Sequence, residues 1–210
     1  FIPENLICSR LVYCAGIRCL IVGVLIGLYF VTIKGIIILV LLVFAIISIY
    51  CYSTNIVNAG LGELFVAIKG CMIVLGSYYI QSDSIELTSA YVGIIIGLLS
   101  SVVLLVTSFP DYDADKKSGR QTLVIVIGKE NSIKLLAIII GVTYAMIIGG
   151  SLFNVLPIFS IIAISSAPFA VKAVRKLRRF HDTGELVSSM ANSIIYSRVC
   201  GIILAVSFIV

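Results

Sequence analysis

Long apolar segments separated by short polar ones constrain the fold of this chain more than any other feature. Hydrophobic residues make up 60% of the 210 residues and charged residues only 12%, whereas soluble domains carry about a quarter charged residues. A helix of roughly 20 apolar residues crosses about 30 Å of hydrocarbon. A backbone in lipid must satisfy its own hydrogen bonds, which favours helices. The sequence therefore predicts an all-α, polytopic transmembrane helical bundle.

Seven segments are predicted to cross the membrane, and the second and sixth have the least sharply defined ends. Their approximate ranges are 11–33, 35–51, 61–80, 88–109, 132–150, 155–174 and 189–210. No stretch has the composition of an interdomain linker, so residues 1–210 are expected to form one domain. The pairs Gly23 and Gly27, and Gly93 and Gly97, each place small residues on one helix face, which permits close helix packing there.

Basic residues gather on one side of this predicted bundle. Loop 110–134 carries five Lys or Arg and segment 172–179 another five, whereas the opposite side has only Lys34, with Asp83 and Glu86. The positive-inside rule places the two basic segments on the cytoplasmic side, and we expect a prokaryotic cell membrane. Topology and contact with anionic membrane lipid account for the net charge of +5, so no nucleic-acid partner is expected.

Four charged residues fall inside predicted spans, all nearer the cytoplasmic end: Arg18, Glu63, Lys69 and Arg198. Each costs on the order of 2.5–3.5 kcal/mol at a helix centre and less near the ends. One interpretation is a polar cavity that opens toward the cytoplasm. The other is that these long side chains extend to the headgroup region. Lys69 and Arg198, which lie deepest, are candidate substrate-binding residues.

An acidic cluster follows the fourth apolar segment directly. Asp111 and Asp115 would project from one face of a helix with their Cβ atoms about 5–6 Å apart, while Asp113 would point elsewhere. Mg²⁺ prefers oxygen ligands and is often held by one or two carboxylates together with substrate phosphates. The alternative is a solvated loop whose acidic residues favour a helix N-terminus.

Three basic residues follow the acidic cluster: Lys116, Lys117 and Arg120. They are placed to neutralise the remaining phosphate charge, and the Arg120 guanidinium can do so through two parallel hydrogen bonds. The combination predicts a membrane enzyme that binds a divalent metal and a phosphorylated substrate. A membrane transporter with a cytoplasmic metal- or phosphate-binding loop is an alternative, as is a purely structural membrane subunit. A CDP-alcohol phosphotransferase is disfavoured because neither DG nor AR pairs occur near 111–128.

Three stretches of the chain resemble a known family. The stretch from Phe109 to Gly128, FPDYDADKKSGRQTLVIVIG, is similar to the second Asp-rich motif of the UbiA superfamily of intramembrane prenyltransferases. The segments Gly60–Phe65, GLGELF, and Gly76–Gln81, GSYYIQ, resemble the branch that prenylates 1,4-dihydroxy-2-naphthoate in menaquinone synthesis. The resemblance extends over essentially the whole chain.

The resemblance implies nine transmembrane helices around a cavity, with two Asp-rich motifs that bind Mg²⁺ and the diphosphate of an isoprenoid donor on the cytoplasmic side. An allylic carbocation then forms and is attacked by the acceptor, while the prenyl tail lies in an apolar tunnel. By position, the resemblance implies that Asp111 and Asp115 bind the metal, assisted by Asp113. It implies that Lys117 and Arg120 bind the diphosphate. Tyr52, with its neighbour Ser53, would lie near the reacting carbon.

The chain also departs from the family pattern. The first Asp-rich motif, NDxxD, is absent, and no acidic cluster precedes residue 111. The seven segments are expected to be the family's third to ninth helices, with the first two helices and their motif upstream of Phe1. The lysine that commonly follows the tyrosine is also absent, and Lys69 is a candidate substitute. Thr107 and Ser108 stand where Asn or Glu is common in the family. The acceptor is therefore left open between a naphthoate, another aromatic compound and a lipid headgroup.

Overall fold

The computed structural model describes residues 9–52, 56–179 and 182–209, and within these ranges the chain is helical, with no strand. The longer helices are α1 (Ser9–Lys34), α2 (Ile36–Cys51), α3 (Gly62–Ser82), α4 (Leu87–Thr107), α7 (Lys129–Leu152), α8 (Ala167–Leu177) and α9 (Thr183–Ser207). The shorter elements are the 3₁₀ helices η2 (Val57–Ala59) and η3 (Ile158–Ser166) and the α-helices α5 (Tyr112–Lys117) and α6 (Leu123–Ile127). The predicted all-α class is confirmed.

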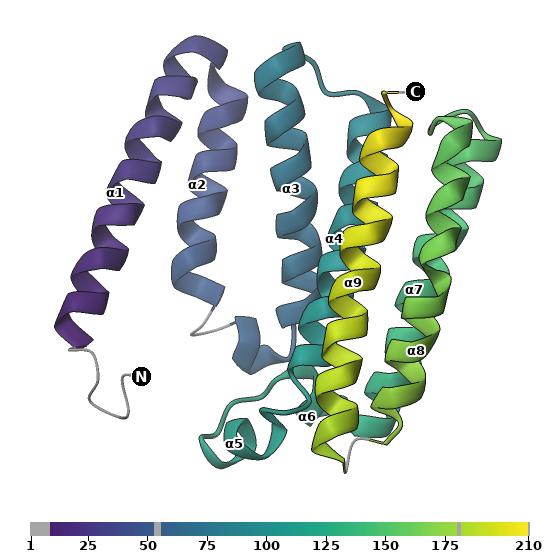
Figure 1. Cartoon of the computed structure of the whole chain (residues 1–210). Helices are drawn as coiled ribbons and strands as arrows, with labels where there is room; N and C mark the ends of the chain where they lie inside the picture. Colours follow the sequence, from purple (N-terminus) through teal and green to yellow (C-terminus); the bar gives the residue numbers. More distant parts are fainter. Residues whose placement is uncertain (1–8, 53–55, 180–181, 210) are drawn as a thin grey trace.

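Six stretches of the described chain are long and apolar enough to cross a membrane. They correspond to six of the seven predicted segments, and the sixth segment is built from η3 running into α8. The predicted range 35–51 forms α2, which runs antiparallel to α1 (Figure 1). This helix has 16 residues and is about 24 Å long, which is short of a full span.

Helix ends differ from the predicted ones where polar residues extend a helix. α9 begins at Thr183, six residues before the predicted span, because the Asp182 side chain accepts a hydrogen bond from the Gly184 N–H at 2.8 Å. A capping carboxylate of this kind satisfies one of the free N–H groups of the first turn. The predicted polar loop 110–131 likewise contains α5 and α6 and the first residues of α7.

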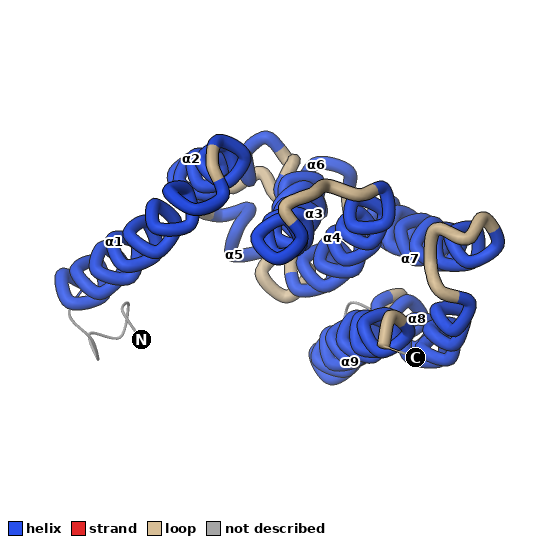
Figure 2. Tube along the Cα trace, turned by 90° about the horizontal axis from the view of Figure 1, so that it is seen from above, coloured by secondary structure: helices blue, strands red, loops and turns tan. Residues whose placement is uncertain are grey.

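The helices form a curved row with a second layer on one side. Figure 2 shows α1, α2, α3, α4 and α7 in the row, with α8 and α9 beside α4 and α7. α3 and α4 approach most closely where glycines face each other, since a Cβ on Gly70 would lie 2.8 Å from the Gly97 Cα. Gly93 packs against Cys71 in the same contact, so the predicted packing role of Gly93 and Gly97 is confirmed. In the other predicted pair, Gly27 packs against Leu42, but a Cβ on Gly23 would meet nothing within 4 Å.

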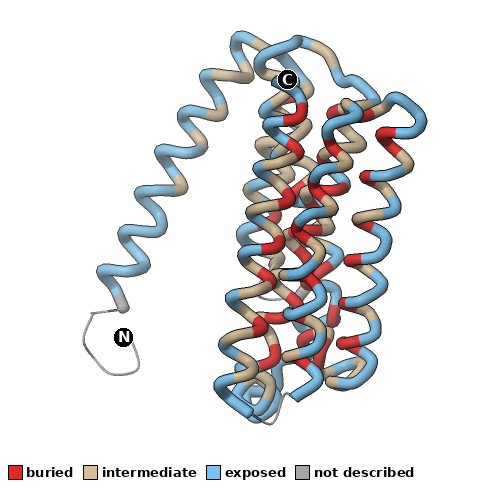
Figure 3. Tube along the Cα trace, turned by 45° about the vertical axis from the view of Figure 1, so that its right-hand side comes forward, coloured by how far each residue is buried: buried red, intermediate tan, exposed pale blue. Residues whose placement is uncertain are grey.

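Buried residues concentrate in α4, α7, α8 and α9, whereas α1 is exposed along its length (Figure 3). The exposed side chains of α1 are mostly apolar, as expected of a helix that faces lipid. The two basic segments, at α5–α7 and at the end of α8, lie at one end of the bundle (Figure 1). At the other end, Lys34 and Asp83 form an ion pair at 2.7 Å. The basic segments therefore lie together at one end of the bundle, as the sequence predicts.

Candidate active site

The acidic cluster folds into the short helix α5 and the turns on either side of it. Asp111 stands at its N-cap position, and the Asp115 N–H donates to the Asp111 carbonyl at 2.8 Å. The two residues are therefore separated by one helical turn, and both line the same small cavity. Asp113 is exposed and does not line this cavity. The spacing of four residues thus separates Asp111 and Asp115 from Asp113, as the i, i+4 geometry requires.

A glycine turn brings Arg120 back to the acidic pair. Gly119 has φ of +79°, and the N–H groups of Gly119 and Arg120 donate to the carbonyls of Lys116 and Asp115 at 3.3 and 3.0 Å. This pattern is a Schellman motif, which favours glycine at the left-handed position. The turn places Arg120 Nη1 3.5 Å from Asp115 Oδ1. The cation and the carboxylate pair therefore share one edge of the cavity.

The Tyr112 side chain ties α5 to the start of α7. Its ring is partly buried against the core, with the Lys129 Nζ 4.3 Å and the Lys116 Nζ 5.8 Å from the ring centroid. Ammonium groups at these distances are attracted to the face of an aromatic ring. Lys116 thus lies over Tyr112, and neither Lys116 nor Lys117 lines the cavity.

The cavity between α5 and the helix ends has a volume of about 160 Å³. Its walls come from the end of α2, the start of α3, the end of α4 and the segment from α5 to α6. Its polar lining residues are Tyr52, Glu63, Asp111, Asp115, Arg120 and Thr122, and Ser108 and Thr107 contribute from the end of α4. We call this space the polar cavity. It brings together residues from four separate parts of the chain.

Tyr52, at the C-cap of α2, lines the polar cavity and also a larger apolar groove. Burial raises the pKa of the Tyr52 hydroxyl, the negative charge of Glu63 raises this pKa further, and the positive charge of Arg120 lowers it. The hydroxyl is therefore protonated at neutral pH and can donate a hydrogen bond. The same data place Tyr52 within electrostatic range of Glu63 and Arg120.

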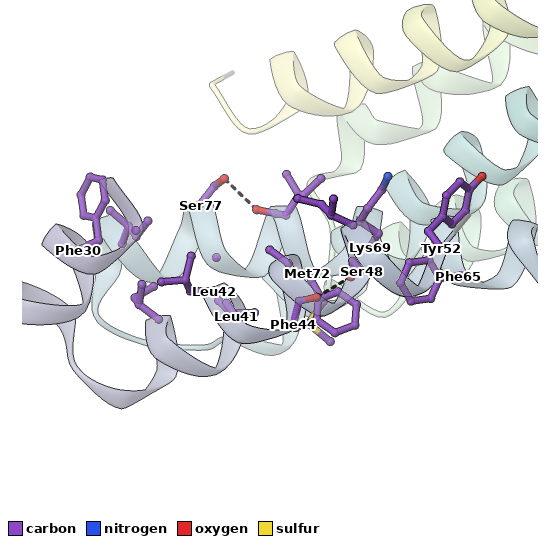
Figure 4. A pocket seen from close by; sticks show the side chains of 17 residues that line it. Phe30, Leu41, Leu42, Phe44, Ser48, Tyr52, Phe65, Lys69, Met72 and Ser77 are labelled. Atoms are coloured by element: carbon purple, nitrogen blue, oxygen red, sulfur yellow. Dashed lines mark hydrogen bonds between the residues drawn. The ribbon is translucent and has the colours of Figure 1, made fainter. Parts of the chain in front are cut away.

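The apolar groove lies between α1, α2 and α3 and has a volume of about 640 Å³. Figure 4 shows Tyr52, Phe65 and Lys69 at one end and Phe30 at the other. The Lys69 Nζ lies 5.7 Å from the centroid of the Tyr52 ring. Tyr52 lines both the groove and the polar cavity. The apolar groove therefore lies next to the polar cavity and extends away from it toward Phe30.

The structure brings half of the ten predicted site residues together. Tyr52, Asp111, Asp115 and Arg120 meet at the polar cavity, and Lys69 stands beside Tyr52. Arg198 is exposed on α9 and lines neither space. Ser53 lies outside the described residues. The predicted roles of all ten residues, including the five that meet at these two spaces, stay predictions.

Sequence reasoning missed two residues of the polar cavity as site residues, Glu63 and Thr122. Glu63 is only 5% exposed, which favours the cavity interpretation over extension to the headgroups for this residue. The available signal was its place in the GLGEL segment. Thr122 is 8% exposed, and its hydroxyl has no hydrogen-bond partner in the described structure. The sequence signal for Thr122 was its place in the Asp-rich motif, two residues after Arg120.

The donor set of the polar cavity fits Mg²⁺ held jointly with a phosphorylated substrate. Within the described residues, no group of three or more His, Cys, Asp or Glu side chains is arranged to hold a metal ion alone. Asp111 and Asp115 supply carboxylate oxygens at one edge of the cavity. Mg²⁺ commonly takes one or two carboxylates, several waters and substrate phosphate oxygens, so this pair suits a site that a diphosphate completes.

Comparison with known proteins agrees with this chemistry. The model of the UbiA prenyltransferase family matches residues 1–194. The 1,4-dihydroxy-2-naphthoate octaprenyltransferase of Bacillus subtilis is 34% identical over 115 residues, which are 54% of this chain and 37% of that protein. The same-named protein of Escherichia coli is 27% identical over 124 residues, which are 59% of this chain and 40% of that protein.

A cyanobacterial relative is also similar. The 2-carboxy-1,4-naphthoquinone phytyltransferase of Synechocystis is 26% identical over 131 residues, which are 62% of this chain and 43% of that protein. The chain thus spans less than half the length of each of these relatives. No solved structure matches the chain significantly.

Proposed function

Because the chain belongs to the UbiA prenyltransferase family, we propose that it transfers an isoprenoid chain from a prenyl diphosphate to an aromatic acceptor in the membrane. The names of its relatives make 1,4-dihydroxy-2-naphthoate the first acceptor to test. One observation carries the proposal. A cavity with two carboxylates and an arginine opens beside an apolar groove, and Tyr52 lines both. A substrate with a diphosphate head and an apolar tail needs such a pair of spaces.

In this proposal, Asp111 and Asp115 hold Mg²⁺ at the edge of the polar cavity, and the ion supplies positive charge to the leaving diphosphate. Arg120 binds the same phosphate groups and neutralises the charge that develops as the allylic C–O bond breaks. The electron pair of that bond leaves with the diphosphate. A ring carbon of the acceptor then donates an electron pair to the allylic cation and forms the new C–C bond. The ring becomes aromatic again when the substituent on that carbon leaves without its bonding electrons, as CO2 if it is a carboxylate or as a proton if it is hydrogen.

Tyr52 stands where the head of the donor passes into its tail. We propose that its ring face stabilises the allylic cation, while the apolar groove holds the tail and excludes water from that end. Lys69 lines the groove beside the Tyr52 ring and would attract the diphosphate to this end of the groove, next to the polar cavity. Lys116 and Lys117 would act on the phosphates through their positive field.

We place this chemistry on the cytoplasmic side, since the basic segments lie at the same end of the bundle as α5. Cysteine labelling in whole cells tests this placement. Ser118→Cys, next to α5, should resist a membrane-impermeant thiol reagent until the cells are opened. Ser84→Cys, at the opposite end, should react in intact cells. The six native cysteines are first replaced. The reverse pattern would contradict the cytoplasmic placement.

Transfer itself is tested in membranes that contain the protein expressed from its complete reading frame. Labelled prenyl diphosphates of several lengths are supplied with 1,4-dihydroxy-2-naphthoate, or with the native lipids alone, with and without Mg²⁺. We expect a prenylated naphthoate that forms only with Mg²⁺. Labelled product from lipids alone would assign a lipid acceptor instead. The absence of any prenylated product would refute the prenyl-transfer proposal.

A further inference from the structure

Glu63 presents a buried carboxylate to the polar cavity from the wall formed by the start of α3. The residue is 5% exposed and lines the cavity. The start of α3 is held against α4, because the Ser101 hydroxyl donates to the Glu63 carbonyl at 2.6 Å. This bond engages the backbone of Glu63, while its side chain stands in the wall of the cavity.

No described cation forms an ion pair with this carboxylate. Arg120 is paired with Asp115, and Lys69 lies over the Tyr52 ring. An isolated buried carboxylate is costly unless something hydrogen-bonds to it, and charged groups inside membrane proteins are typically functional for this reason. The unpaired hydroxyl of Thr122 in the same cavity independently indicates that the space is completed by a polar ligand.

The charge of Glu63 restricts which part of the substrates it can face. It does not form a three-carboxylate metal group with Asp111 and Asp115 in the described structure. Without a metal ion between them, a diphosphate would be repelled by its negative charge. A carboxylate accepts hydrogen bonds and donates none. The group that fits is therefore a neutral hydrogen-bond donor on the second substrate.

We propose that the Glu63 carboxylate accepts a hydrogen bond from a ring hydroxyl of the aromatic acceptor and orients the ring for attack. This inference rests on the proposed prenyl transfer. The position is suitable, because Glu63 lies within electrostatic range of Tyr52, which stands where the two spaces meet. A hydrogen bond from the hydroxyl to an ionised carboxylate is among the stronger kinds. The same hydrogen bond shifts electron density from the hydroxyl oxygen into the ring and makes the attacking ring carbon a better nucleophile.

The test pairs a change in the protein with a change in the acceptor. Wild-type protein, Glu63→Gln and Glu63→Ala are assayed with 1,4-dihydroxy-2-naphthoate and with its two analogues that lack one hydroxyl each. In wild type, loss of the bound hydroxyl should raise the acceptor KM by about 10-fold or more, the scale of a charged hydrogen bond. In Glu63→Ala, the same loss should change the acceptor KM by less than about 3-fold. In Glu63→Gln, whose amide oxygen still accepts a neutral hydrogen bond, the change should be smaller than in wild type. The KM for the prenyl diphosphate should stay within about 2-fold of wild type.

Glu130→Gln is the matched control, because Glu130 is exposed in the first turn of α7 at the same end of the bundle. It removes the same charge and should preserve the wild-type preference for the hydroxyl. If the Gln and Ala variants fail to accumulate, Glu63→Asp keeps the charge but shortens the side chain, and it should lower the hydroxyl preference with donor KM unchanged.

Three outcomes would overturn the role of Glu63. An unchanged hydroxyl penalty in the variants would show that the carboxylate does not bind the hydroxyl. An equal loss of kcat with every acceptor would assign Glu63 to the donor cation instead. A raised KM for the prenyl diphosphate would assign it to the diphosphate site. Failure of wild-type protein to prenylate any naphthoate is a different result, since it refutes the proposed function itself.

Discussion

The Arg120 side chain forms an ion pair with Asp115, which precedes Arg120 by five residues. The Arg120 Nη1 lies 3.5 Å from the Asp115 Oδ1. The contact depends on the turn at Gly119, which reverses the chain immediately after α5. Asp115 is thereby positioned by α5 and partly neutralised by the same residue that we assign to the diphosphate. Because the Arg120 side chain is 45% exposed, it can move from Asp115 to an incoming phosphate at little cost.

Replacement of Gly119 by alanine should displace Arg120. A left-handed conformation costs a residue with a Cβ atom roughly 1–2 kcal/mol, and the turn can relieve this strain by shifting Arg120. We expect the KM for the prenyl diphosphate to rise by several-fold, with protein yield and the acceptor KM unchanged. Gly141→Ala is the control, because a Cβ there meets nothing within 4 Å and its φ is not positive. Equal kinetics for the two variants would contradict the role of the turn.

Asp111 and Asp115 should be far more sensitive to substitution than Asp113. Either Asp111→Asn or Asp115→Asn removes an anionic oxygen from the proposed metal site, and we expect kcat to fall by about 10²-fold, the scale of losing one stabilising group. Asp113→Asn should cost much less, because Asp113 is exposed outside the polar cavity. Initial rates at several Mg²⁺ concentrations measure this difference. A chelator should abolish transfer and Mg²⁺ should restore it. Similar losses at all three positions would contradict the geometry of α5.

Much of this fold follows from composition and periodicity, because in lipid an apolar segment of sufficient length has hardly any alternative to a helix. The i, i+4 relation of Asp111 and Asp115 was also predictable from spacing, and the structure places both at one cavity. The position of Glu63 in the wall of the polar cavity was not predictable from spacing. A charged residue near a helix end can extend to the headgroups or turn into a cavity, and only the packing of α3 on α4 decides between these positions.

Contacts between distant segments were the hardest part to predict. That Tyr52 lines both the polar cavity and the apolar groove depends on how the end of α2 packs beside α3 and α5. Helix ends were also misplaced where a side chain outside the apolar segment caps the helix, as Asp182 does for α9. The capped α9 begins six residues before the predicted span, in a mixed polar and apolar stretch that an apolar-segment prediction omits.

The raised pKa of Tyr52 gives a stability effect at high pH. The folded protein holds this proton more tightly than the unfolded chain, since burial and Glu63 disfavour the phenolate. Below the ordinary tyrosine pKa of about 10, Tyr52 should therefore add no pH dependence to the folding stability. As the pH rises above that value, ionisation of Tyr52 in the unfolded chain should lower the folding stability. Tyr52→Phe removes the ionisable group, so its Tm in detergent should fall less steeply than that of wild type between about pH 9 and 11. Parallel curves would show that Tyr52 ionises equally in both states.

Thr122→Val should separate binding from stability. The Thr122 hydroxyl is buried without a partner and makes no side-chain hydrogen bond to the first turn of α6. Its replacement by a methyl group of similar shape should therefore leave folding stability unchanged or raise it by up to about 1 kcal/mol.

If the hydroxyl binds substrate, the same change should raise the KM for the prenyl diphosphate by about 3- to 10-fold, the scale of one neutral hydrogen bond. Thr122→Ser, which retains the hydroxyl, should keep a KM close to that of wild type. Thermal unfolding in detergent and initial rates measured on the same preparations check both parts. A Val variant with reduced stability and unchanged KM would mean that the hydroxyl serves the fold through a bound water rather than the substrate.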